Sequence, residues 1–113
     1  MIDDDASILE ILRTVLEEAG FTVITAASID QVPAGTRADC VIADLVGMGP
    51  YSPDAAIASL RSVRARFAGV PLILATAHRV ALADREAFGA VAALNKPFDL
   101  DEVVRVTNAA IAR

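Results

Sequence analysis

The sequence contains only one cysteine, Cys40, and no apolar run that approaches the roughly 20 residues a membrane-spanning helix needs. A single cysteine cannot form an internal disulfide, and its place inside an apolar run is typical of a small buried hydrophobe. The N-terminus, Met1 to Asp5, is acidic where a secretion signal would be basic. We therefore expect a cytoplasmic domain that spans no membrane.

Basic residues are also few. The chain has 10 Lys plus Arg against 15 Asp plus Glu, a formal charge of −5 and a pI near 4.6. This balance argues against nucleic-acid binding, which usually needs a basic face. Lys96 is the one lysine among ten cations, which indicates either a position that needs a compact ammonium group or chance.

The length bounds the architecture. A chain of 113 residues with 55% hydrophobic content is long enough for one core and too short for two. No internal repeat, low-complexity tract or linker divides it, so we expect one domain over residues 1–113.

The stretch from Asp39 to Asp44 is the most informative. Val41, Ile42 and Ala43 follow one another without polar alternation, which is typical of a strand covered on both faces of a parallel sheet. Asp44 ends this strand. In open parallel sheets the carboxyl ends of the strands border the ligand crevice, so an acid placed there is a candidate for chemistry.

Strand and helix patterns alternate about five times along the chain. The predicted strands are 1–2, 21–26, 41–43, 72–75 and 91–94, and the predicted helices are 6–19, a short one within 28–38, 53–67, 81–88 and 100–110. The first helix should present Ile8, Leu12, Val15 and Ala19 on its apolar face. Right-handed crossovers between such units produce a parallel sheet with helices on both faces.

Polar residues follow the predicted strands and would therefore line one rim of the sheet. They are Asp3, Asp4, Asp44, Thr76 and Lys96. Carboxylates this close together need a cation, and hard oxygen ligands suit Mg²⁺. A carboxylate that attacks a phosphoryl group needs the metal on one side of the phosphoryl oxygens and further donors on the other. Lys96 and the Thr76 hydroxyl are suitable donors, which points to acyl-phosphate formation on an aspartate.

These residues together resemble the bacterial two-component response-regulator receiver domain, and the resemblance runs over the whole chain. The matching parts are Asp3-Asp4, Asp44-Leu45, Thr76-Ala77 and Lys96-Pro97-Phe98. The resemblance implies a flavodoxin-like, CheY-like α/β fold, with a doubly wound five-stranded parallel sheet in the order 2-1-3-4-5 and a shortened first strand. It also implies a signalling module and not an enzyme.

The resemblance further implies roles for individual residues. Asp44 would be the phosphoacceptor, and Thr76 and Lys96 would hold the phosphoryl oxygens. Mg²⁺ would be held by Asp4, Asp44 and the backbone carbonyl of Val46, with Asp3 acting through water.

The resemblance implies partners as well. A histidine kinase or histidine phosphotransferase would supply the phosphoryl group, and a downstream protein would bind the surface around the last helix. We expect a monomer or weak dimer that binds neither nucleic acid nor membrane.

Four features depart from the family pattern. The opening strand is reduced to Met1-Ile2, so either the chain start has been clipped or misassigned, or the domain is less stable than its composition suggests. The loop Gly47 to Tyr51 replaces the usual methionine–proline. Ala93 occupies the position of an aromatic switch residue. The second and fourth helices look short.

Other interpretations remain open. The acids from Asp3 to Asp5 are also compatible with a solvated helix N-terminus. Thr76 could merely cap a strand–helix turn, and Lys96 could be a surface cation. His78 is typical of an exposed loop residue. At the level of function, a receiver-like interaction domain that signals without phosphate is the alternative to a phosphorylated module. A small flavin-binding protein ranks well below both, because no hydroxyl-rich loop follows the first strand.

Overall fold

The computed structural model describes residues 1–3, 5–44, 53–76, 89–95 and 98–112, with the side chains of residues 53–57 and 59 excepted. In chain order its elements are α1 (Ala6–Glu18), the 3₁₀ helix η1 (Ile29–Gln31), β1 (Val41–Ala43), α2 (Pro53–Arg66), β2 (Leu72–Thr76), β3 (Ala92–Asn95) and α4 (Leu100–Ile111). The predicted helix at 81–88, the loop at 47–51 and the Lys96–Pro97 bond lie outside the described residues.

The three strands form a parallel sheet in the order β1-β2-β3. Two further segments extend it through single parallel bridges, because Ile2 pairs with Ala43 of β1 on one side and with Ala26 on the other. From edge to edge the segments are therefore residue 26, residue 2, β1, β2 and β3. This is the predicted order 2-1-3-4-5, with the first strand shortened as expected.

The prediction of a strand at 21–26 was wrong, since only Ala26 forms a bridge there. The alternating burial of residues 21–24 suits a strand, with Phe21 and Val23 partly buried and Thr22 and Ile24 exposed. A strand is defined by its pairing, however, and the neighbouring segment supplies only Met1 to Asp3. Residues 21–25 therefore have the β-branched residues typical of a strand but form no ladder with a neighbouring segment.

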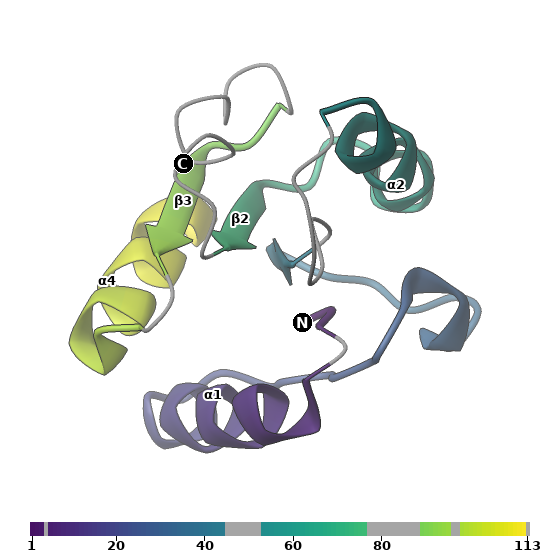
Figure 1. Cartoon of the computed structure of the whole chain (residues 1–113). Coiled ribbons are helices and arrows are strands. Elements are labelled where there is room, and N and C mark those ends of the chain that lie inside the picture. The colour runs from purple at the N-terminus through teal and green to yellow at the C-terminus, as the bar shows by residue number, and fades with distance from the viewer. Residues whose placement is uncertain (4, 45–52, 77–88, 96–97, 113) are drawn as a thin grey trace.

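Helices cover both faces of the sheet (Figure 1). On one face Leu12 and Leu16 of α1 and Val103 and Val106 of α4 share a core with Ile73 at the centre of β2. On the other face Leu60 and Val63 of α2 share a second core with Leu72 and Leu74, and Phe67 and Ile2 also belong to it. Adjacent residues of β2 thus contribute to opposite cores, which is why its apolar run has no polar alternation.

Helix α1 begins as predicted but buries a different stripe. Asp5 is its N-cap and accepts hydrogen bonds from the backbone N–H groups of Ser7 and Ile8 at 3.0 and 3.3 Å. The buried residues are Leu9, Leu12 and Leu16, whereas Ile8 and Val15 are only partly buried and Ala19 is exposed. The helix carries two overlapping apolar stripes. Packing against the sheet and α4 buries the stripe that contains Leu12 and Leu16.

The short helix predicted within 28–38 is the single 3₁₀ turn η1, and Arg66 anchors the segment that follows it. The Arg66 guanidinium donates to the backbone carbonyls of Ile29 at 3.1 Å and Val32 at 2.7 Å, and also to that of Pro33. It also lies over the Phe67 ring, 5.9 Å from its centroid. The fork of donors on arginine suits several carbonyls at once, so α2 holds this connection in place.

The remaining boundaries agree with the sequence patterns. Helix α2 begins at Pro53, β2 covers 72–76, and Asp99 caps α4 by accepting from the N–H groups of Asp101 and Glu102 at 3.0 and 3.4 Å. Val103, Val106 and Ala110 are buried as predicted, together with Thr107. None of the described helices is both long and apolar enough to cross a membrane.

Candidate functional site

Asp44 lies where β1 ends, at the rim predicted from the sequence. Its backbone N–H donates to the carbonyl of Ile2 at 2.9 Å, which ties it to the central segment. The residue is partly buried, and its Oδ1 atom is shielded from solvent. A carboxylate held by the backbone at the end of a buried strand has a defined position, which a phosphoacceptor or a metal ligand requires.

Asp3 lies beside Asp44 on the neighbouring segment. Because Ile2 pairs with Ala43, the next residues, Asp3 and Asp44, fall in register on strands about 4.8 Å apart. Asp3 is only 3% exposed, and its Oδ1 accepts from the backbone N–H of Asp5 at 2.9 Å. The turn into α1 therefore orients this carboxylate.

Thr76 completes the described part of the rim. It is the last residue of β2, is 1% exposed and pairs in register with Asn95, the last residue of β3. Because Ala43 pairs with Leu74, Thr76 lies one position beyond Asp44 along the sheet. Asn95 is a rim residue that sequence analysis did not single out, although it directly precedes Lys96.

The structure thus brings together three of the six predicted site residues, Asp3, Asp44 and Thr76. The other three, Asp4, Val46 and Lys96, lie outside the described residues, as does His78.

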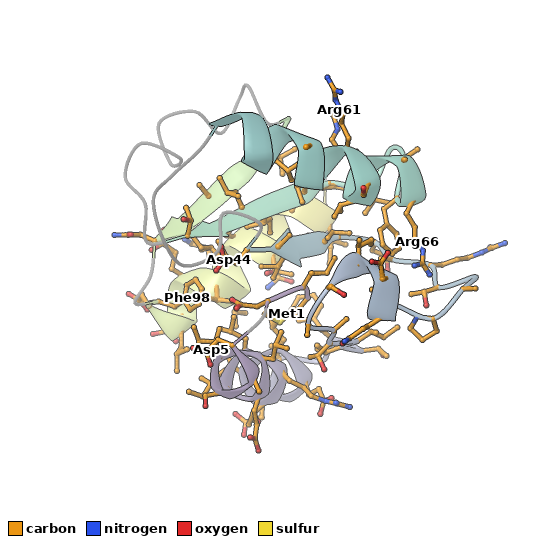
Figure 2. All side chains as sticks on the ribbon, turned by 45° about the vertical axis from the view of Figure 1, so that its right-hand side comes forward. Met1, Asp5, Asp44, Arg61, Arg66 and Phe98 are labelled. Atoms are coloured by element: carbon orange, nitrogen blue, oxygen red, sulfur yellow. The ribbon has the colours of Figure 1, made fainter. Side chains whose placement is uncertain are left out.

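Helix ends surround this rim. Asp5, Asp44 and Phe98 lie at one end of the molecule in Figure 2, whereas Arg66 lies at the other. The N-terminus of α1 starts directly after Asp5, and α4 starts after Asp99. Helix N-termini favour negative charge, so they partly offset the repulsion between the acids gathered here.

The donor set of the rim matches the chemistry of a hard divalent cation. Asp3 and Asp44 supply carboxylate oxygens, which Mg²⁺ prefers over nitrogen or sulfur, and Mg²⁺ completes its octahedron with water. Within the described ranges no group of three or more His, Cys, Asp and Glu side chains could hold a metal ion. The third carboxylate expected from the sequence, Asp4, falls in a gap between those ranges.

Cys40 does not contribute to this site. It lies in the same chain segment as β1 but at the amino end, away from Asp44. Burial raises the pKa of its thiol to about 11, so the thiol stays protonated and is a weak nucleophile at neutral pH.

The chain is similar to known proteins over almost its whole length. The "Response regulator receiver domain" family matches residues 1–108. The "DNA-binding transcriptional regulator NtrC" of Escherichia coli K12 is 32% identical over 117 residues, which cover 99% of this chain and 24% of that protein. The chain therefore spans about a quarter of the length of this relative.

Solved structures show the same fold. A putative response regulator from Chloroflexus aurantiacus superposes with a TM-score of 0.74 at 27% identity, covering 99% of this chain and 94% of that one. The chemotaxis protein CheY4 of Vibrio cholerae superposes with a TM-score of 0.76 at 23% identity, covering 96% and 93%. The fold is thus flavodoxin-like and CheY-like, as predicted, and the chain belongs to the response regulator receiver domain family of two-component signalling proteins.

Proposed function

We propose that this domain is a phosphoacceptor that takes a phosphoryl group from a histidine kinase or histidine phosphotransferase onto Asp44. The observation that carries the proposal is the register of the rim, which places Asp3, Asp44 and Thr76 at adjacent strand ends. In the reaction an oxygen of the Asp44 carboxylate attacks phosphorus, the bond from phosphorus to the donor's imidazole nitrogen breaks, and the imidazole takes up a proton. The product is an acyl phosphate.

The residues around Asp44 have separate tasks. When bound, Mg²⁺ supplies positive charge against the phosphoryl oxygens. Asp3 and Asp44, with Asp4 and the Val46 carbonyl, would hold the cation. The buried Thr76 hydroxyl and the Lys96 ammonium would donate to the phosphoryl oxygens from the β2 and β3 side.

The output of such a domain is a change of surface that a downstream protein recognises. Ala93 limits how this change of surface could be transmitted. It lies within β3, pairs in register with Leu74 and packs, partly buried, against the core that contains Leu60 and Val63 of α2. A methyl group has no rotamers that could move between buried and exposed positions. Transmission would therefore use the backbone around Thr76 and Lys96 instead of a rotating aromatic ring. Ala93 equally favours the second candidate, an interaction domain that signals without phosphate.

Acetyl phosphate with Mg²⁺ should produce a single phosphoryl adduct in intact-mass spectra, and Asp44→Asn should abolish it. Asp39→Asn is the matched control, because Asp39 is an exposed acid at the opposite end of the same segment. Without Mg²⁺ the adduct should disappear. A folded protein that forms no adduct would instead support the phosphate-independent interaction domain.

Asp3→Asn should weaken Mg²⁺ binding about tenfold or more in calorimetric titrations, because the amide keeps the acceptor for the Asp5 N–H but lacks the charge. The matched control is Asp5→Asn: its Oδ1 is occupied in capping α1, and asparagine is an equally good N-cap. Equal affinity in wild type and Asp3→Asn would remove Asp3 from the metal site.

Thr76→Val should slow phosphorylation by acetyl phosphate about ten- to a hundredfold, because it removes one hydrogen bond to a charged oxygen. Valine keeps the branched shape that fits this 1% exposed position. Thr76→Ser retains the hydroxyl and should stay close to wild type. If the serine variant were as slow as the valine variant, packing and not hydrogen bonding would explain the effect.

A further inference from the structure

Asn95 is a polar residue of the rim to which the proposed function assigns no task. It is the last residue of β3, pairs in register with Thr76 and is exposed to solvent. In the part of the chain that the structure describes, no hydrogen bond holds its carboxamide. The donors and the acceptor of this side chain are therefore available at the edge of the site.

The side chains of Thr76 and Asn95 belong to the same face of the sheet. Successive residues of a strand alternate between the two faces. In β2, Leu72 and Leu74 pack in the core on the α2 side, and Thr76 is the next residue of that series. In β3, Ala93 packs against the same core, and Asn95 follows it by two positions. Thr76 and Asn95 are thus neighbours in register on strands about 4.8 Å apart.

The hydroxyl group of Thr76 is oriented by its protein neighbours. Because Thr76 is only 1% exposed, protein groups and not bulk water decide which way the hydroxyl proton points. A hydroxyl has one donor and two acceptor lone pairs, and a carboxamide has two N–H donors and one acceptor oxygen. The Thr76 oxygen can therefore accept an N–H from Asn95 and still donate its own proton elsewhere. Ala93, the preceding residue of β3 on this face, has only a methyl group and cannot do so.

We propose that Asn95 is a positioning residue for phosphoryl transfer to Asp44. Its Nδ2–H group donates to the hydroxyl oxygen of Thr76 and so directs the hydroxyl proton towards a phosphoryl oxygen. A donor that already points at this oxygen needs no reorientation when negative charge develops there. Asn95 itself does not touch the phosphoryl group and acts through Thr76. The inference rests on the proposed function, because it requires a phosphoryl group on Asp44.

The exposed position of Asn95 makes this role testable. Replacement of an exposed side chain that has no hydrogen bond in the described structure should change stability little, so variants should fold. Leucine has nearly the shape of asparagine but no donor or acceptor, which makes Asn95→Leu the informative change. Asn108→Leu is the matched control, because Asn108 is an exposed asparagine near the C-terminal end of α4.

Asn95→Leu should form the phosphoryl adduct about two- to tenfold more slowly than wild type, because one neutral hydrogen bond is lost. The rate is measured by intact mass over time with acetyl phosphate and Mg²⁺. Asn95→Gln keeps the N–H donors and should react faster than Asn95→Leu. Asn108→Leu should react at the wild-type rate.

A double-mutant cycle separates positioning from a structural effect. Thr76→Val has no hydroxyl to direct, so adding Asn95→Leu to it should slow phosphorylation no further. NMR spectra give a second readout. In excess acetyl phosphate the side-chain NH₂ resonances of Asn95 should shift in wild type, because the Thr76 oxygen that accepts from them changes its own hydrogen bonding. Thr76→Val should lose this shift.

The outcomes distinguish this inference from the proposed function. If folded wild type forms no adduct, the phosphoacceptor proposal fails and the positioning role fails with it. If wild type is phosphorylated but Asn95→Leu reacts at the same rate, only the positioning role is overturned. The positioning role is also overturned if Asn95→Leu slows Thr76→Val by the same factor as it slows wild type.

Discussion

The pairing of Met1 to Asp3 between residues 24–26 and residues 42–44 is the interaction on which the rest of the structure depends. Ile2 is buried at 3% exposure, and its backbone bonds to Ile42 and Asp44 join the 24–26 segment to the three-stranded sheet. The same pairing sets Asp3 beside Asp44.

The two ends of the sheet consequently have different chemistry. Parallel strands point the same way, so each strand delivers the residue that follows it to one rim, and here those residues are Asp3, Asp44 and Thr76. Around the amino ends of the strands the described residues are mainly apolar, with one base and one acid among them, Arg37 and Asp39. The cores on the two faces of the sheet hold the strands in place. Leu12, Ile73 and Val63 are each at most 1% exposed, and burial of each side chain stabilises the fold by about 1.5–3 kcal/mol.

Local signals predicted the elements whose boundaries depend on nearby residues. Asp99 caps α4, Pro53 starts α2, and the apolar run before Thr76 is a central strand, because capping, proline geometry and two-sided burial act within a few residues. The signals failed where the outcome depends on a distant partner. On α1 the buried residues are Leu9, Leu12 and Leu16, and the last two share a core with α4 and the sheet. Residues 21–25 have a strand-like pattern but form no strand in the structure.

The sequence alone determined the alternation of strands and helices and which polar residues follow the strands, because hydrophobic period and capping act over a few residues. The strand order was expected from the resemblance to the receiver family. Only the tertiary structure decided which residues are neighbours in register: Asp3 with Asp44, Thr76 with Asn95, and Arg66 with the carbonyls of Ile29 and Val32. Such pairings arise from packing between segments far apart in the chain, and no local pattern of residues encodes them.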